Sequence, residues 1–120
     1  MREITIYNTG EKIPIKGRMD CKTRGFLYLV WSNKDPKVQY LGRCSRQVSD
    51  RLMEHRRDVM NNKKGKAVAE HFHKLRSKVG DFRFMPFLKI RSDNPHVILC
   101  LERYYINKYN LVAGGINSIL

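Results

Sequence analysis

Two short apolar runs in the first third of the chain predict a β-hairpin. Residues 26–31 read FLYLVW, a continuous run of aromatic and aliphatic side chains, and residues 38–41 form a second apolar run. The segment 32–36 between them is rich in turn-forming residues, so we predict two strands joined by a loop of about six residues. In residues 82–90 one set of apolar side chains falls at every second position, from Phe82 to Ile90, and alternates with a more mixed set that begins at Arg83. This period of two predicts a third strand. Within it, Pro86 favours an edge position or a bulge, because proline cannot donate a backbone hydrogen bond.

Three other stretches have apolar residues three or four positions apart, as in an amphipathic helix. The first lies within 45–62 and has His55 on its apolar face, and the second ends at Gly80. The third opens at 94–95 with Asn-Pro, which is typical of an N-cap and a first-turn proline, and extends to about Tyr109. The apolar positions of the first two helices are Val48, Leu52, Val59, Val68, Phe72, Leu75 and Val79.

The segment before the hairpin has a weaker pattern. A short alternating apolar stretch is followed by Gly10 and Pro14, which predicts an edge strand or an extended arm over residues 1–24. The order hairpin, helix, helix, strand, helix then predicts an α+β fold, a small three-stranded antiparallel sheet flanked by helices. A chain of 120 residues has room for one core, so we expect a single globular domain at 25–120.

The net charge of the chain indicates which classes of molecule the domain binds. The chain has 24 Lys and Arg against 11 Asp and Glu, a net charge of +13. Such a molecule attracts polyanions, above all nucleic acid, with an acidic protein or an anionic membrane surface as lesser alternatives. The basic loop at 61–66 is either a solvated surface or a track for the DNA backbone. The candidate DNA-binding residues are Arg43, Arg46, Arg56, Arg57, Lys63, Lys64 and Lys66.

The cysteines and two histidines suggest no metal centre of their own. Cys21, Cys44 and Cys100 are odd in number and widely spaced, which fits small apolar side chains in a reducing, intracellular compartment. His71 and His73 are two residues apart and therefore point to different sides of a helix, a poor spacing for joint ligation. No apolar run approaches the roughly 18 residues of a membrane span, so we expect no membrane partner.

A third group of residues suggests phosphodiester chemistry. Such cleavage needs cations for the charge of the transition state, a group that handles the proton of water, and a carboxylate for a metal. Arg51 and His55 are four residues apart, so they project from adjacent helical turns. Tyr28 and Tyr40 fall on the two hairpin strands. Glu102 lies in the apolar stretch of the last helix, where a carboxylate is costly unless its charge is compensated.

Each of these features also has a structural interpretation. Tyrosines in strands are more often core residues than catalysts, and an Arg/His pair on one helix face is usually solvated. Glu102 has candidate ion-pair partners in Arg103 and the neighbouring lysines. Its apolar neighbours nevertheless make Glu102 the most informative carboxylate of the chain.

Five short motifs occur in the order of a known nuclease signature. They are FLY at 26–28, YLG at 40–42, RLMEHRRDV at 51–59, LERYYINKYN at 101–110 and GGIN at 114–117. Together, from about Gly25 to Asn117, they resemble the GIY-YIG nuclease superfamily, which has the α+β fold predicted above. More narrowly, CKTRGFLYLVW and LERYYINKYN are similar to the endonuclease domain of Penelope-like retroelements.

The resemblance implies a role for each matching residue. Glu102 resembles the residue that binds a single divalent metal, usually Mg²⁺ with Mn²⁺ as the alternative, and hard cations of this kind prefer oxygen ligands. Arg51 resembles the arginine that contacts the scissile phosphate, where its planar fork of donors fits two oxygens.

The remaining motif residues are implied to handle water and support the site. Tyr28 and Tyr40 resemble the tyrosines that orient or activate the attacking water. His55 is implied to transfer a proton or contact phosphate, so the identity of the general base stays open. Asn117 resembles the terminal asparagine that supports the site structurally or through hydrogen bonds.

Three departures from the family pattern stand out. Phe26 and Leu27 replace the first glycine and isoleucine of the signature. In the second half-motif Leu41 replaces the isoleucine, a conservative change that keeps the glycine at Gly42. Penelope-type domains carry a pair of cysteines between the half-motifs that is thought to bind zinc. Ser32 and Asp35 stand near those places here, which argues against a structural zinc site.

The resemblance therefore implies a metal-dependent DNA endonuclease that nicks one strand, because one Glu102 and one Arg51 per chain build one site. The narrower likeness implies a role in retroelement integration, a longer polyprotein with a reverse transcriptase domain, and a nuclear location if the element is eukaryotic. The alternatives are a catalytically inactive DNA- or RNA-binding module of the same fold and a basic domain for an acidic protein. We expect a monomer.

Overall fold

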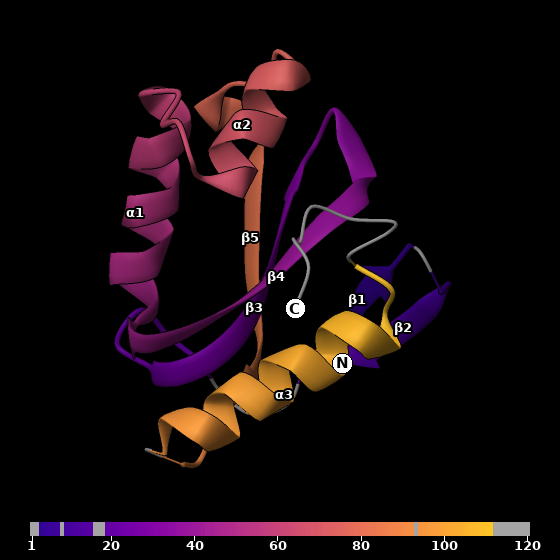
Figure 1. The fold of residues 1–120 in the computed structure, drawn as a ribbon, viewed down its shortest axis with the longest axis vertical. Coiled ribbons are helices and arrows are strands. Elements are labelled where there is room, and N and C mark those ends of the chain that lie inside the picture. Colours follow the sequence, from indigo (N-terminus) through magenta and orange to yellow (C-terminus); the bar gives the residue numbers. More distant parts are fainter. Residues whose placement is uncertain (1–2, 8, 16–18, 93, 112–120) are drawn as a thin grey trace.

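The computed structural model describes residues 3–7, 9–15, 19–92 and 94–111 (Figure 1). Within these ranges it has two antiparallel sheets, three α-helices and a short 3₁₀ turn. The elements in chain order are β1 (Glu3–Ile6), β2 (Glu11–Pro14), β3 (Arg24–Ser32), β4 (Asp35–Gln47), α1 (Val48–Met60), α2 (Ala67–Lys74), η1 (Val79–Asp81), β5 (Phe82–Lys89) and α3 (Pro95–Lys108).

The larger sheet has the strand order β4-β3-β5, which confirms the predicted three-stranded α+β fold. Side chains of β3 alternate between two cores: Phe26 and Tyr28 pack with α1 and α2, whereas Leu27 and Leu29 pack with α3 and the first hairpin. The helices accordingly lie on opposite faces of this sheet (Figure 1). Because both faces of β3 are buried, its sequence is a continuous apolar run instead of an alternating one.

The placement of Pro86 is confirmed. β5 is an edge strand, and Pro86 lies opposite Tyr28 where the register with β3 shifts. The shift lies between Leu27 and Tyr28 and leaves Phe87 as an extra residue on β5. A proline is tolerated there because an edge position does not require its missing donor.

The predicted hairpin loop is wrong in length. β4 begins at Asp35, so a two-residue turn at Asn33 and Lys34 joins the strands instead of a loop of about six residues. The extra residues are absorbed by an irregular register between Trp31 and Ser32. Ser32 is buried at this end, and its hydroxyl accepts a hydrogen bond from the Lys34 backbone N–H at 3.1 Å, which stabilises the turn.

The second helix ends earlier than predicted. α2 stops at Lys74, Arg76 has a φ of 55°, and Val79 belongs to the 3₁₀ turn instead of the helical stripe. The Ser77 backbone N–H closes the helix by donating to the Phe72 carbonyl at 2.8 Å. The Ser77 side chain is then buried 2.6 Å from the Ser32 hydroxyl, a contact that local periodicity does not reveal.

The other helix boundaries agree with the sequence to within a few residues. α1 lies inside the predicted range 45–62. At the start of α3, the side chain of Asn94 accepts a hydrogen bond from the His96 backbone N–H at 2.9 Å, with Pro95 in the first turn. The predicted N-cap is therefore confirmed.

The N-terminal segment forms a hairpin instead of a single edge strand or arm. β1 and β2 pair with each other in a separate two-stranded sheet, and Ile4 and Ile6 are buried in the core shared with α3. The buried side chain of Gln39 connects the two sheets: it donates to the Thr5 carbonyl at 2.9 Å and accepts from the Tyr7 backbone N–H at 3.3 Å. The division of the chain into an arm at 1–24 and a domain at 25–120 stays a prediction.

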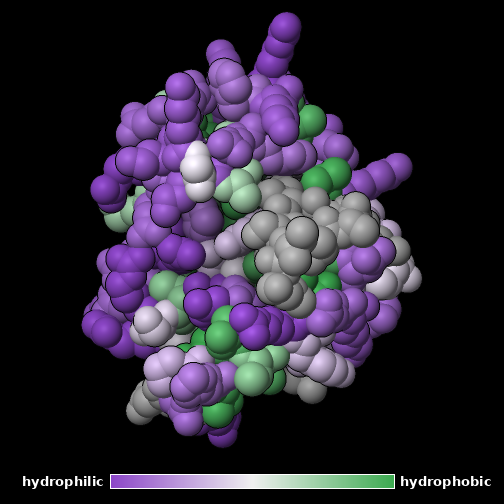
Figure 2. Space-filling model, in the orientation of Figure 1, coloured by the Kyte–Doolittle hydropathy of each residue, from purple (hydrophilic) through white to green (hydrophobic). Residues whose placement is uncertain are grey.

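The surface is hydrophilic over α1 and α2 and more mixed over α3 (Figure 2). Val97 and Tyr104 of α3 are among the exposed large hydrophobic side chains. Within the described ranges, no helix combines the length and the apolar character needed to cross a membrane.

Candidate active site

The two motif tyrosines come from the paired strands β3 and β4. Tyr28 is fully buried and Tyr40 is half-buried, and both belong to the core on the α1 side of the sheet. Their ring centroids are 6.3 Å apart. The hairpin register places Tyr28 opposite Gly42 and Val30 opposite Tyr40, so the pleat directs both phenols toward α1.

Gly42 makes room for these phenols. A Cβ atom at this position would lie 2.4 Å from the Tyr28 hydroxyl oxygen and 2.9 Å from the Cε2 atom of Tyr40. Both distances are far below van der Waals contact, and the obstructing atoms are rings fixed in a packed core. The glycine of the YLG motif is therefore required by the close approach of the two tyrosine rings to the backbone.

Tyr28, His55 and Arg51 form one hydrogen-bonded network. The Tyr28 hydroxyl is 2.7 Å from His55 Nε2, and Arg51 donates its Nε–H to the same hydroxyl oxygen at 2.9 Å. The direction of the bond between Tyr28 and His55 follows the histidine tautomer: Nε2 accepts the tyrosine proton when the ring is protonated at Nδ1.

Burial keeps this network neutral apart from the arginine. Desolvation, together with the nearby positive charge of Arg51, lowers the pKa of His55 to about 4. Desolvation likewise raises the pKa of Tyr28, with a further contribution from Tyr40, and raises the pKa of Tyr40 itself. At neutral pH the site therefore holds two tyrosine hydroxyls and an uncharged imidazole that can accept a proton.

Glu102 lies on the other side of β4. Its side chain is 11% exposed and forms an ion pair with Arg43 of β4. Arg43, and not Arg103 or a lysine, thus compensates the negative charge of Glu102, which lies in the apolar stretch of α3. The negative charge of Glu102 also contributes to the raised pKa of Tyr40. The site of Glu102 and that of the tyrosines therefore meet at β4, the free edge of the sheet.

Two hollows flank Arg51. One has a volume of about 120 Å³ and lies between α1 and the start of α2, lined by Tyr40, His55 and Lys66 among others. The other has a volume of about 400 Å³ and lies between the end of β4 and the first turns of α3. Arg51 lines both hollows.

The comparison with protein families decides the class of this site. A family model described as the GIY-YIG catalytic domain matches residues 24–117. The chain belongs to this family. Among the curated proteins and the solved structures that were compared with the chain, none matches. The domain is therefore a nuclease, a hydrolase of phosphodiester bonds, and the resemblance of its motifs to the GIY-YIG superfamily is confirmed.

Sequence reasoning missed one residue of the GIY-YIG site. Glu54 of α1 forms ion pairs with both Arg51 and Arg46. Hydrogen bonding from Arg46 and the charge of Arg51 lower the pKa of Glu54. Glu54 therefore fixes one side of the Arg51 guanidinium while the Tyr28 hydroxyl fixes the other. The three-residue spacing from Arg51 to Glu54 was the available signal.

The predicted DNA-binding residues fall into two groups in the GIY-YIG domain. Arg43 and Arg46 line the larger hollow, and Lys66 lines the smaller one. The other predicted contacts are exposed on α1 and the loop that follows it, and neither lining includes them. These are Arg56, Arg57, Lys63 and Lys64.

The remaining candidates do not join the network. His71 is half-buried, and its buried Nε2 atom has no hydrogen-bond partner among the residues that the structure describes, whereas His73 is exposed on α2. Cys44 is buried, whereas Cys21 and Cys100 are exposed. In the part of the chain that the structure describes, no three His, Cys, Asp or Glu side chains are arranged to hold a metal. Asn117 lies outside the described residues.

Proposed function

We propose that this GIY-YIG domain is a metal-dependent DNA endonuclease that nicks one strand per binding event. The observation that carries the proposal is the Tyr28 hydroxyl, which is held between Arg51 and His55, two residues that line the smaller hollow together with Tyr40. This arrangement combines a phosphate-binding cation, a hydroxyl and a proton acceptor in one place. These are the groups that phosphodiester hydrolysis needs from side chains.

Arg51 contacts the scissile phosphate in this proposal. Its Nε–H is engaged by Tyr28 and one terminal nitrogen by Glu54, so the guanidinium plane is fixed before substrate binds. The planar fork of donors then meets two phosphate oxygens and stabilises the charge that develops on them. Preorganisation of this kind avoids the cost of ordering a flexible side chain during the reaction.

Tyr28, Tyr40 and His55 handle the attacking water. A water oxygen forms the new bond to phosphorus as the bond to the leaving oxygen breaks, and the water must lose a proton. The tyrosine hydroxyls orient this water, and the Tyr28 hydroxyl passes a proton to Nε2 of His55 as it receives one. The leaving oxygen takes up a proton from solvent.

Glu102 would hold the divalent metal, Mg²⁺ or Mn²⁺. The donor chemistry fits, because carboxylate oxygens suit hard cations and Mg²⁺ is commonly held by one or two carboxylates with water and substrate oxygens as its other ligands. Arg43 donates a hydrogen bond to Oε1 of Glu102, and a bound cation would take the place of the arginine charge beside this carboxylate. When bound, the metal supplies charge neutralisation at the phosphate oxygens.

DNA is the proposed substrate and nicking the proposed outcome. The net charge of +13 favours binding of a polyanion such as DNA. Asn117 is proposed as a further support of the active site. One Arg51 and one Glu102 per chain build one site, which cuts one strand unless a second chain binds. The exposed basic residues Arg56, Arg57, Lys63 and Lys64 extend the contact to the DNA backbone.

The narrower setting is also a proposal. The stretches CKTRGFLYLVW and LERYYINKYN support a likeness to the endonuclease domain of Penelope-like retroelements. In that setting the domain would serve integration, work as a monomer beside a reverse transcriptase domain, and reside in the nucleus of a eukaryotic host. Free cysteines in the described ranges suit a reducing, intracellular compartment.

Nicking of supercoiled plasmid tests the activity. We expect the protein with Mg²⁺ or Mn²⁺ to convert supercoiled plasmid to the open circular form, and Arg51→Ala and Glu102→Gln to lose more than about 100-fold in rate. Arg91→Ala and Glu11→Gln are matched controls, because both residues are exposed and outside the site. Salt-dependent DNA binding without nicking at any metal concentration would instead support the inactive binding module.

A further inference from the structure

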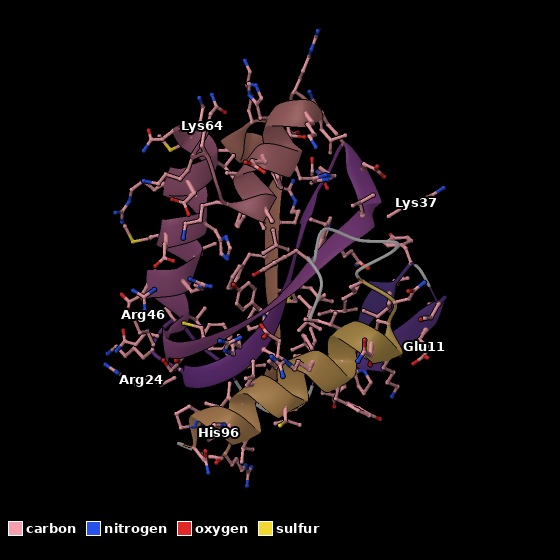
Figure 3. All side chains as sticks on the ribbon, viewed as in Figure 1. Glu11, Arg24, Lys37, Arg46, Lys64 and His96 are labelled. Atoms are coloured by element: carbon pink, nitrogen blue, oxygen red, sulfur yellow. The ribbon has the colours of Figure 1, made fainter. Side chains whose placement is uncertain are left out.

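The larger hollow beside Arg51 has two unlike walls. β4 and α1 supply one wall, which is cationic through Arg43, Arg46 and Arg51. α3 supplies the other, which combines the apolar side chains of Ile98 and Leu99 with the imidazole of His96. Figure 3 shows Arg46 at the junction of β4 and α1, and His96 at the start of α3 on the same side of the molecule. A groove with these walls can take a ligand with one anionic and one apolar part.

The cationic wall retains donors for an anion. The ion pairs of Arg43 with Glu102 and of Arg46 with Glu54 each use one terminal nitrogen of the arginine. A guanidinium has five N–H donors, so each arginine can bind a phosphate oxygen in addition to its carboxylate. Arg46 is about half exposed, which leaves it open to a ligand.

The opposite wall has a feature that phosphate binding does not require. His96 is exposed, and its described hydrogen bond is made by its backbone N–H and not by its ring. A nucleobase stacks on imidazole and aliphatic surface, whereas a duplex backbone meets only cations and polar donors. The volume of about 400 Å³ lies within the range of small-molecule sites.

We propose that this groove binds one unstacked nucleotide next to the scissile phosphate, with its phosphate on Arg46 and its base against His96 and Leu99. The inference rests on the nuclease function proposed above and adds a substrate class to it. An unpaired nucleotide enters such a groove more easily than a paired one, because the cost of unpairing is already met. The domain should therefore favour DNA that is single-stranded or distorted beside the cleavage site.

Binding of two oligomers of equal charge tests the groove without relying on catalysis. We would measure the affinity of the protein, without metal and at one salt concentration, for short oligothymidine and for an abasic oligomer of the same length. Stacking predicts that the native protein binds oligothymidine about tenfold more tightly. His96→Ala should lose most of this preference, and His96→Phe should keep it. His73→Ala is the matched control, since His73 is exposed on α2 outside the groove.

Three results would overturn the proposal: equal affinities of the native protein for both oligomers, an unchanged preference in folded His96→Ala, or rescue by His96→Lys and not by His96→Phe. The last result would show that position 96 serves a phosphate and not a base. Circular dichroism confirms that each variant is folded. Plasmid nicking by the same samples separates the two proposals, because a protein that keeps the His96-dependent preference but never nicks contradicts the catalytic function alone.

Discussion

The two sides of β4 hold the chemistry of this domain in different ways. On the α1 side, the buried side chains of Tyr28 and His55 form a network in which Arg51 is the charged member. On the α3 side, Glu102 meets Arg43, whose side chain is 46% exposed, in an ion pair. Core packing fixes the first arrangement, whereas the second depends on charges that a metal or phosphate can replace. Packing therefore holds the groups for proton transfer in place, whereas the charged groups of the cation site can change partners.

The largest effect should come from filling the space at Gly42. A Cβ in Gly42→Ala would overlap the Tyr28 hydroxyl, so the network on the α1 side must shift. We expect nicking to fall by more than about 100-fold and the free energy of unfolding to fall by roughly 1–3 kcal/mol, as in overpacked cores. Gly80→Ala is the control, because a Cβ there meets nothing within 4 Å. Full activity in Gly42→Ala would show that the close packing is unimportant.

Acid should weaken the α1 side through His55. Burial and Arg51 hold the pKa of the folded histidine at about 4, below the ordinary value of 6.5. Between these two values the unfolded chain binds a proton that the folded chain does not, so the free energy of unfolding falls as pH drops from 6.5 to 4. Above pH 6.5 both states hold His55 uncharged and this loss is absent. The loss is at most about 3 kcal/mol.

Denaturant unfolding at a series of pH values measures this loss. His55→Gln should flatten the dependence across that pH window, and His73→Gln should leave it unchanged. If His55→Gln keeps the full slope, another group is responsible for it.

A smaller effect should follow from loosening Arg51. Glu54→Gln removes the charge that pairs with Arg51 and Arg46 but keeps the shape of the side chain. We expect kcat to fall about tenfold with little change in KM, because the misplaced guanidinium fails chiefly in the transition state. Asp50→Asn, an exposed change on α1, is the control. An increase in KM alone would mean that Glu54 acts on DNA binding.

The smallest effect on stability should be on the α3 side. Arg43→Ala leaves the nearly buried Glu102 carboxylate without its partner, but the arginine is half exposed and the pair is partly screened by solvent, so the free energy of unfolding should fall by about 1 kcal/mol. With its carboxylate released, Glu102 should need a lower metal concentration for half-maximal nicking. Lys37→Ala, at an exposed position on β4, is the control. A higher metal requirement in Arg43→Ala would show that Arg43 supports the cation site instead of competing with it.

Local patterns predicted the parts of the fold that local forces determine. The apolar run of β3, the edge proline of β5 and the N-cap at Asn94 each follow from backbone chemistry within a few residues. The end of α2 could not be predicted in this way. The backbone leaves the helix at Arg76, whose residue type does not favour a positive φ, and Ser77 beyond it contacts Ser32, 45 residues away in the chain.

The candidate site shows the same limit. Tyr28, Tyr40, Arg51 and His55 were found because a family motif orders them, and the structure brings them together. The partner of Glu102 is 59 positions away on β4, so sequence spacing favoured Arg103 and the neighbouring lysines instead. Pairing between distant elements is set by the packed fold, which no single stretch of sequence contains.

Nicking by Tyr28→Phe tests the central claim most directly. The change removes only the hydroxyl that links Arg51 to His55 and keeps the buried ring. We predict that Tyr28→Phe stays folded, binds DNA as the native protein does and nicks plasmid more than about 100-fold more slowly. Tyr104→Phe, at an exposed position on α3, should nick at the native rate. A folded Tyr28→Phe protein that nicks at the native rate would contradict the account.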